Sequence, residues 1–442
     1  GLGDVYKRQA YYSSVPLLAL TADRPVQFRH TNAPQTINQS GIFTNFVVGQ
    51  VDCEVSPSNQ QMADVTNLLA CMTGRSVASG HVDLTKGPGH INLQFDMPLM
   101  PEATDIAWIP VDVSELPAEP SRRPAQEKLE LPARGLVIIG DLNDPSVEVE
   151  ATELAQSLGW PVVWEPTSQA HQCDNALSHG SLLLGTQALP IPDAVITVGT
   201  VGLSRSVLGV LATTPQHIAV QIPSASQVSP DPQLTADTVI SGVPDGVNQP
   251  DSEWLALWRF ADDKAAQIVQ QALGGQALNG PSAAVALWNH ANPSDQLMVA
   301  ASWSVRHLEA YAPTRPGLRT FGNRGANGID GLISTAWGLA ECSATRTYLL
   351  VGDVAFLHDV GGLNVGDNSQ PNLTIVVLDN DGSGIFSQLE QAQPTYREHY
   401  EQIFGTPHGQ DLWRISEAFG VPSTRVTTRD EFEVKLTATN RI

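Results

Sequence analysis

The sequence predicts an α/β protein built on parallel β-sheets, and three observations carry this prediction. Apolar runs of strand length recur, as at Tyr348–Val351 and Leu373–Leu378, with the aliphatic content of strands buried on both faces. These two runs end at the small or polar residues Gly352 and Asp379, where a following helix can begin. Segments with the apolar spacing of helices alternate with such runs, which is the pattern of doubly wound sheets.

Composition limits the class of partner. The 24 basic and 46 acidic residues give a formal charge of −22, so the surface repels nucleic acid and anionic membranes, and neither is expected as a partner. No apolar run approaches the ~20 residues of a membrane helix, and no stretch resembles a signal peptide. Four scattered cysteines without CxxC spacing fit a reducing compartment, so we expect a cytoplasmic protein.

The chain of 442 residues is long enough for two or three domains. A proline-rich stretch at 117–132 is interpreted as a linker. We expect a first domain at 1–115, a linker at 116–134, a central α/β domain at 135–250, a helical linker at 251–290 and a last domain at 291–442.

Individual elements follow from apolar periodicity. Strands are expected at 15–21 (buried), 90–95, 135–140, 161–164, 194–199, 217–222 and 318–321, and from Thr424 onward. Helices are expected at 60–73, 147–158, 251–278, 297–310, around Ala336 and at 412–419. Gly140-Asp141 is interpreted as a turn.

Asp353 and Asn380 follow the two central strands and should be neighbours, because the carboxyl ends of parallel strands meet at one edge of a sheet. With the backbone carbonyl of Gly382 they form a hard oxygen set of the kind Mg²⁺ prefers, and the glycines allow a phosphate to approach the backbone. The sequence therefore indicates a metal–diphosphate site. Two ordinary turns remain the alternative, since Asp, Asn and Gly are common turn residues.

The motif Gly352-Asp353, followed after residues 354–379 by Asn380, resembles the thiamine diphosphate (ThDP) motif of pyruvate decarboxylase-like enzymes. Five stretches narrow this resemblance: Leu20–Pro25 (LTADRP), Gln35–Gln39 (QTINQ), Phe321–Ala336 (FGNRGANGIDGLISTA), Gly352–Asp359 (GDVAFLHD) and Asn380–Ser387 (NDGSGIFS). Together they resemble the menaquinone-pathway family MenD, 2-succinyl-5-enolpyruvyl-6-hydroxy-3-cyclohexene-1-carboxylate synthase.

This resemblance implies three doubly wound, parallel-sheet domains of the ThDP-enzyme type. They are a pyrimidine-binding domain, which is incomplete here, a central α/β domain and a diphosphate-binding domain. It implies Mg²⁺ or Mn²⁺ held by Asp353, Asn380 and the Gly382 carbonyl. The residues implied in cofactor binding are Ser302, Ile329, Gly352, Asp353, Val354, Ala355, Ile385 and Phe386. Ile329 matches the apolar residue that supports the bent cofactor, and a plain core isoleucine is compatible with that role.

The family joins 2-oxoglutarate to isochorismate, both dianions that suit bidentate capture by arginine. Arg306 and Arg324 match positions on the 2-oxoglutarate side, and Arg24 a position facing isochorismate. Arg205 and Gln35 match further substrate positions, and Pro34 departs from the usual Asn. Surface or capping arginines are the alternative for each. His90, His358 and His408 lack metal-ligand spacing and are not assigned to a site.

The family's activating glutamate precedes the part that this chain resembles, so no catalytic residue is assigned. On this basis, and because the family continues for a further strand beyond Ile442, we expect truncation at both ends. We also expect the chain as given to be inactive. Residues 1–9 match nothing in the family and are interpreted as a possible non-native scar.

The resulting expectation is a ThDP-dependent transferase. It would decarboxylate 2-oxoglutarate and add the succinyl unit to isochorismate in a 1,4 fashion, in a homodimer or tetramer with active sites between subunits. The alternatives are another ThDP-dependent 2-oxo acid decarboxylase or synthase, and a non-catalytic protein with the same fold.

Overall fold

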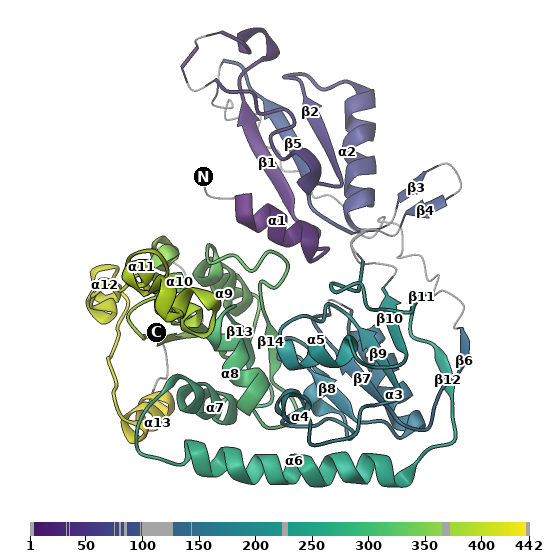
Figure 1. Ribbon diagram of the computed structural model, residues 1–442. Coiled ribbons are helices and arrows are strands. Elements are labelled where there is room, and N and C mark those ends of the chain that lie inside the picture. Colours follow the sequence, from purple (N-terminus) through teal and green to yellow (C-terminus); the bar gives the residue numbers. More distant parts are fainter. Residues whose placement is uncertain are drawn as a thin grey trace. The chain divides into compact units, whose positions relative to one another are not determined.

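The computed structural model describes residues 4–31, 33–34, 36–74, 76–78, 81–83, 86–97, 99, 127–142, 144–222, 229–364 and 372–438. The chain divides into two compact units, shown with their elements in Figure 1. Unit 1 comprises residues 1–125 with 223–228, and unit 2 comprises the remainder.

Unit 1 is built on a three-stranded parallel sheet in the order β1-β5-β2. These strands are β1 (Leu18–Asp23), β2 (Gly49–Cys53) and β5 (Gly89–Gln94), accompanied by α1 (Asp4–Tyr12), α2 (Asn59–Met72) and the hairpin β3 (Ser76–Ala78)–β4 (His81–Asp83). Ser58 starts α2 with a capping box, and Leu68 and Met72 of α2 pack on Ile91. The predicted helix at 60–73 is confirmed.

The prediction that the first strand is buried throughout is wrong. Strand β1 alternates in exposure, with Leu18 37% and Leu20 60% exposed. Alternate side chains of a strand point to opposite faces, and the α2 core takes up only one face of this small sheet.

Unit 2 contains a five-stranded sheet in the order β11-β10-β9-β7-β8, with every pairing parallel. Its elements are β7 (Gly135–Ile139), α3 (Pro145–Leu158), β8 (Val162–Trp164), α4 (Gly180–Thr186), β9 (Ala194–Val198), α5 (Arg205–Leu211), β10 (His217–Gln221) and β11 (Thr238–Ser241). Val137 and Ile139 share a core with α3, while Leu136 and Ile138 share another with α4, α5 and α6 (Ser252–Leu273). Helices therefore cover both faces, as continuous apolar strands require.

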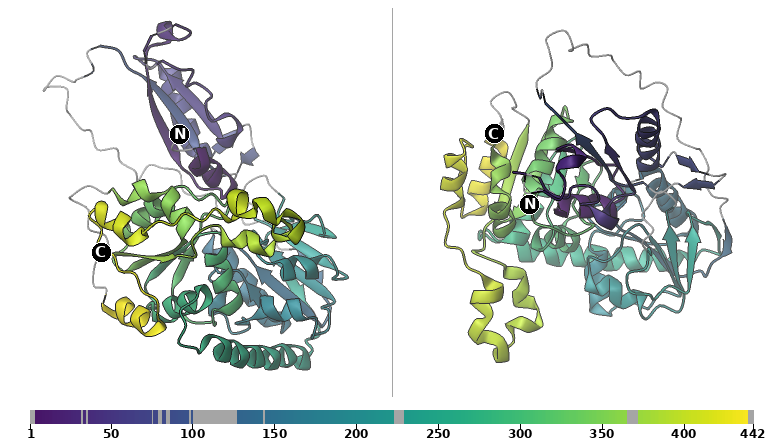
Figure 2. Two further views of the ribbon diagram at one scale, coloured as in Figure 1. Left: turned by 60° about the vertical axis from the view of Figure 1, so that its left-hand side comes forward. Right: turned by 90° about the horizontal axis from the view of Figure 1, so that it is seen from above.

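A second parallel sheet of unit 2 has the order β14-β13-β15-β16. It comprises β13 (Gln296–Val299), β14 (Arg319–Phe321), β15 (Thr347–Gly352) and β16 (Leu373–Leu378). One face packs against α7 (Gly280–His290), α8 (Trp303–Tyr311) and α13 (Arg429–Ala438), and the other against α9 (Leu332–Glu341), α10 (Asp353–His358) and α12 (Leu412–Ala418). Figure 2 gives two further views of these layers.

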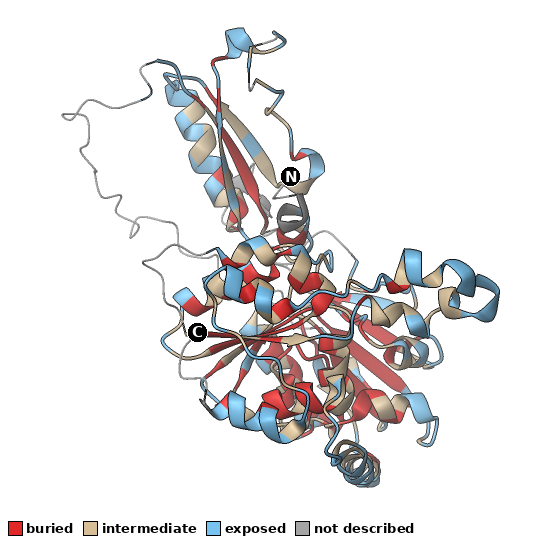
Figure 3. Ribbon diagram, turned by 90° about the vertical axis from the view of Figure 1, so that its left-hand side faces the viewer, coloured by how far each residue is buried: buried red, intermediate tan, exposed pale blue. Residues whose placement is uncertain are grey.

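The two sheets of unit 2 share one hydrophobic core, to which both Ile139 and Tyr348 belong. In Figure 3 buried residues concentrate on these strands and on the helix faces against them. Short elements complete the unit: the parallel pair β6 (Lys128–Glu130) and β12 (Asp245–Val247), α11 (Arg397–Tyr400) and a π-helical turn at Glu401–Gly405. Among the residues described, no helix combines the length and apolar character needed to cross a membrane.

Two predicted elements are wrong. The predicted helix at 297–310 is strand β13 followed by α8, separated at Ser302, which has a φ of 73° that no helix continues through. The apolar run Leu297–Val299 fits either a buried strand or a buried helix, and pairing with β14 and β15 decides for the strand. The strand predicted from Thr424 is absent: the segment makes one isolated bridge, Thr428 to Ala277, and then enters α13.

Candidate active site

A cavity of about 1520 Å³ in unit 2 opens at the carboxyl ends of β13, β14, β15 and β16, where open parallel sheets bind ligands. Every residue of unit 2 predicted for the site lines it, except Arg205. These lining residues are Ser302, Arg306, Arg324, Ile329, Gly352, Asp353, Val354, Ala355, Asn380, Gly382, Ile385 and Phe386.

Asp353 is the best-anchored polar group of the cavity. It is 2% exposed and is the first residue of α10. Its Oδ2 accepts hydrogen bonds from the backbone nitrogens of Asn380 (3.1 Å) and Gly382 (2.8 Å), and its Oδ1 from that of Val354 (2.8 Å). These bonds join the ends of β15 and β16 and hold the carboxylate in one orientation.

The three predicted metal ligands converge. One arm of the Asn380 side-chain amide lies 3.2 Å from Asp353 Oδ2 and 2.8 Å from the Gly382 carbonyl oxygen. If that arm is Nδ2 it donates to both oxygens, and if it is Oδ1 three oxygens face one another. Since Mg²⁺ with ligands at ~2.1 Å places neighbouring oxygens roughly 3 Å apart, this spacing fits a bound Mg²⁺ with the amide oxygen turned inward.

Glycine is required at position 382. Its φ is +137°, and a Cβ there would lie 2.2 Å from the Gly405 carbonyl oxygen. Other lining residues also have positive φ, namely Ser302 (73°), Asn327 (53°) and Asp381 (57°). Backbone strain of this kind collects at binding sites, where the surrounding structure maintains it.

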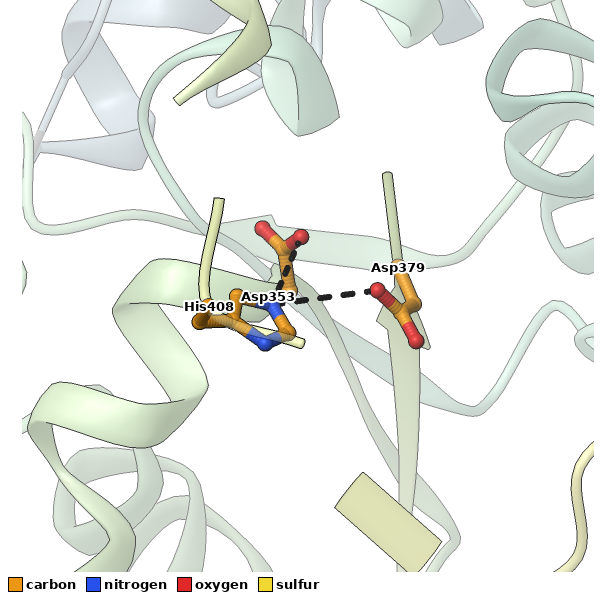
Figure 4. A group of neighbouring side chains, drawn as sticks. All are labelled: Asp353, Asp379 and His408. Atoms are coloured by element: carbon orange, nitrogen blue, oxygen red, sulfur yellow. Dashed lines mark hydrogen bonds and ion pairs between the residues drawn. The ribbon is translucent and has the colours of Figure 1, made fainter. Parts of the chain in front are cut away.

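His408, 55 residues from Asp353 in the sequence, joins this cluster, and Figure 4 shows its ring beside Asp353 and Asp379. Its Nε2 lies 3.3 Å from Asp353 Oδ2 and 3.9 Å from Asp379 Oδ1. The backbone nitrogen of Gln410 donates to His408 Nδ1 (3.0 Å), so in the neutral ring Nε2 carries the proton and donates to Asp353. Asp353, Asp379 and His408 could also hold a cation, with ligand atoms within 4.8 Å of one another.

The sequence argument did not assign His408 to the site, because spacing along the chain gives no sign of this contact. The contact depends on the segment that follows the π-helical turn. Asp381 holds this segment, because its Oδ1 accepts hydrogen bonds from the backbone nitrogens of His408 (3.0 Å) and Gly409 (2.7 Å).

Asp359 holds the turn that carries Ile329. Its carboxylate accepts from the backbone nitrogens of Gly331 (2.8 Å), Ile333 (2.7 Å) and Ser334 (3.3 Å) at the start of α9. Gly331 adopts a left-handed φ of 70° there. Ile329 is 38% exposed and lines the cavity rather than the core.

Ile385 and Phe386 belong to a 3-10 turn at Gly384–Gln388 directly after the Gly382 turn. Both are only partly buried, and the Phe386 ring contacts Phe404 with centroids 5.7 Å apart. Their side chains therefore remain available to line the cavity rather than filling the core of a longer helix.

Arg306 and Arg324 form the basic side of the cavity, with Arg205 nearby. Burial, with Arg324 and Arg205 as neighbouring charges, lowers the pKa of Arg306. Its Nη1 donates to the Ser302 carbonyl oxygen (3.1 Å), and Arg324 Nη1 donates to Asn327 Oδ1 (2.8 Å). Arg205 is exposed at the first position of α5 and contributes to the cluster from the five-stranded sheet.

Buried acids lie near these arginines. Burial raises the pKa of Glu309 to about 8, with Glu165 adding repulsion, and burial also raises the pKa of Glu165. Burial raises the pKa of Asp141 to about 6, opposed by Arg324. Asp141 follows β7 and forms an isolated β-bridge with Thr200 through two 3.0 Å backbone hydrogen bonds, where the sequence predicts a turn.

Two predicted substrate residues lie in unit 1. Arg24 is exposed at the end of β1, beside Asp23, whose Oδ1 accepts from the Arg24 backbone nitrogen (2.8 Å). Gln35 lies outside the described residues. Asp23 instead binds Arg29, whose guanidinium also contacts Asp52 (2.6 Å) and holds the pKa of Asp52 at about 2.

Comparison with known proteins agrees with this geometry. The family model described as thiamine pyrophosphate enzyme, C-terminal TPP binding domain, matches residues 300–440, which contain most of the cavity. The parallel sheets and this match define the chain as a thiamine diphosphate-dependent enzyme.

Curated relatives narrow the class. A 2-succinyl-5-enolpyruvyl-6-hydroxy-3-cyclohexene-1-carboxylate synthase of Thermobifida fusca is 37% identical over 95% of this chain and 76% of its own length. Synthases of the same name from Kineococcus radiotolerans (36%; 98% and 78% covered) and Enterococcus faecalis (30%; 97% and 77% covered) also match. The chain belongs to the 2-succinyl-5-enolpyruvyl-6-hydroxy-3-cyclohexene-1-carboxylate synthase family.

Proposed function

We propose that this protein decarboxylates 2-oxoglutarate and adds the succinyl unit to isochorismate, using ThDP and Mg²⁺ in menaquinone biosynthesis. One observation carries the proposal. A single cavity joins a hard oxygen set, Asp353, Asn380 and Gly382, to the guanidinium groups of Arg306 and Arg324. Family membership supports the identity of both substrates.

The cofactor, when bound, supplies the thiazolium chemistry that lets a 2-oxo acid lose CO₂. Asp353, Asn380 and the Gly382 carbonyl would hold Mg²⁺ and through it the diphosphate, next to the N-terminus of α10. Ile329 would contact the cofactor from its turn before α9. Gly352, Val354, Ala355, Ile385 and Phe386 also line the cavity and would exclude water from the bound cofactor.

The arginines have the chemistry to recognise anionic substrates. Arg306 and Arg324 would bind the carboxylates of 2-oxoglutarate, with Ser302 as a neighbouring hydroxyl. Arg205 would reach the substrate from the five-stranded sheet, and Arg24 and Gln35 of unit 1 would contribute to isochorismate binding. Family membership further supports a homo-oligomer whose sites lie between subunits, which sedimentation of the protein would test.

The test follows isochorismate loss in the complete gene product with ThDP, Mg²⁺ and 2-oxoglutarate. Loss should require both substrates and disappear in Asp353→Ala. Asp245→Ala is the control, since Asp245 is an exposed aspartate of β12 outside the cavity. Turnover of pyruvate without isochorismate loss would instead indicate another ThDP-dependent synthase. Failure to bind ThDP would leave a non-catalytic protein of this fold.

A further inference from the structure

Among the described residues, the three arginines predicted for the substrate site of unit 2 have no carboxylate partner, although the chain carries a formal charge of −22. Within the described residues, no carboxylate oxygen lies within 4.0 Å of a guanidinium nitrogen of Arg205, Arg306 or Arg324. Arg205 also begins α5, where the positive end of the helix dipole disfavours a cation. A cation kept there against the local preference indicates a functional position.

Glu165 holds the loop that precedes Arg205. It follows β8 at the carboxyl edge of the five-stranded sheet and is 2% exposed. Its Oε1 accepts hydrogen bonds from the backbone nitrogens of Gly202 and Leu203, each at 2.8 Å. These residues directly precede Ser204, the N-cap of α5, so the carboxylate holds the loop from which Arg205 projects.

The other oxygen of Glu165 is not satisfied. Oε2 is buried and accepts no hydrogen bond from the described residues, and the charges that act on the carboxylate favourably are those of Arg324 and Arg306. Leaving a buried carboxylate oxygen without a donor costs stability. The arrangement therefore indicates a role other than stabilising the fold.

We propose that Glu165 is the positioning residue of the substrate-carboxylate subsite. Through Oε1 it fixes the 202–205 loop, whose Gly202 lines the cavity and whose last residue, Arg205, begins α5. The inference rests on the proposed function for its substrate class, a dicarboxylate. Glu165 itself touches neither substrate nor cofactor.

The test measures binding of glutarate, a five-carbon dicarboxylate without the reactive 2-oxo group, by calorimetry, alongside binding of Mg²⁺–ThDP. Glu165→Ala removes the acceptor for two backbone nitrogens and should weaken glutarate binding at least roughly tenfold, with Mg²⁺–ThDP binding unchanged. Glu165→Gln keeps an acceptor oxygen at Oε1 and should return the glutarate affinity to within about threefold of wild type. In the complete gene product, Glu165→Ala should raise KM for 2-oxoglutarate more than it lowers kcat.

Glu148→Ala is the matched control. Glu148 of α3 is another buried glutamate with a raised pKa and an oxygen that accepts no hydrogen bond from the described residues, and the charge that acts on it is that of Asp141. It should leave glutarate binding unchanged. If Glu165→Ala does not fold, Glu165→Asp, which withdraws the carboxylate by one methylene, takes its place.

Three outcomes would overturn the inference. Unchanged glutarate affinity in Glu165→Ala would remove the positioning role. Equal loss of glutarate and Mg²⁺–ThDP binding, or equal loss in Glu148→Ala, would show a general structural role. Absence of glutarate binding by the wild type would instead refute the anion site of the proposed function, and the inference with it.

Discussion

Replacing Gly382 by alanine tests whether the turn after β16 creates the metal site. The new Cβ would lie 2.2 Å from the Gly405 carbonyl oxygen and 3.1 Å from that of Thr406, against an ordinary contact of 3.4–4 Å. The backbone must therefore shift by about 1 Å or leave its φ of +137°. Any residue with a side chain at this φ is strained by on the order of 1–3 kcal/mol. The Gly405 oxygen also accepts from Ser383 (2.7 Å), a bond worth about 1 kcal/mol.

Together these terms amount to roughly 2–4 kcal/mol. If the native conformation of the turn is the one that binds Mg²⁺–ThDP, this cost corresponds to roughly 30- to 1,000-fold in affinity. Calorimetric titration of Mg²⁺–ThDP into wild type and Gly382→Ala measures the loss. Gly338→Ala is the control, because Gly338 lies inside α9 with nothing within 4 Å of a new Cβ, and should gain about 0.5–1 kcal/mol of stability with unchanged binding. Wild-type affinity in Gly382→Ala would refute the reasoning.

Three further predictions concern buried or connecting groups. Burial raises the pKa of Glu309 to about 8 from 4.5, so the folded protein retains a proton that the unfolded chain releases. Stability therefore falls as pH rises from 4.5 to 8, and Glu309→Gln should remove a few kcal/mol of this pH dependence. Parallel Tm–pH curves for both proteins would contradict this prediction. Asp359→Ala removes three backbone hydrogen bonds at the start of α9 and should cost on the order of 3 kcal/mol in denaturant unfolding; a loss under about 0.5 kcal/mol would show that water replaces the carboxylate. His408→Ala should weaken Mg²⁺-dependent ThDP binding several-fold by freeing Asp353 from one donor, and unchanged titration curves would mean that His408 only fills space.

Local pattern was sufficient for much of the fold. The runs at 348–351 and 373–378 correspond to β15 and β16, and the helix at 60–73 to α2, because burial on both faces or on one stripe leaves a periodic trace in the chain. The same reasoning misassigned 297–310, since a short apolar run suits a strand or a helix equally until its neighbours are known.

The sequence by itself was sufficient to place Asp353 and Asn380 together, because each follows a strand and parallel strands end at one edge of the sheet. Family resemblance added the arginines. Only the tertiary structure brought His408, 55 residues away, against Asp353, and placed Glu165 where the charges of Arg306 and Arg324 act on it. Periodicity reports which face of an element is buried, and it carries no information on which distant polar groups meet there. That depends on how two sheets pack around their shared core.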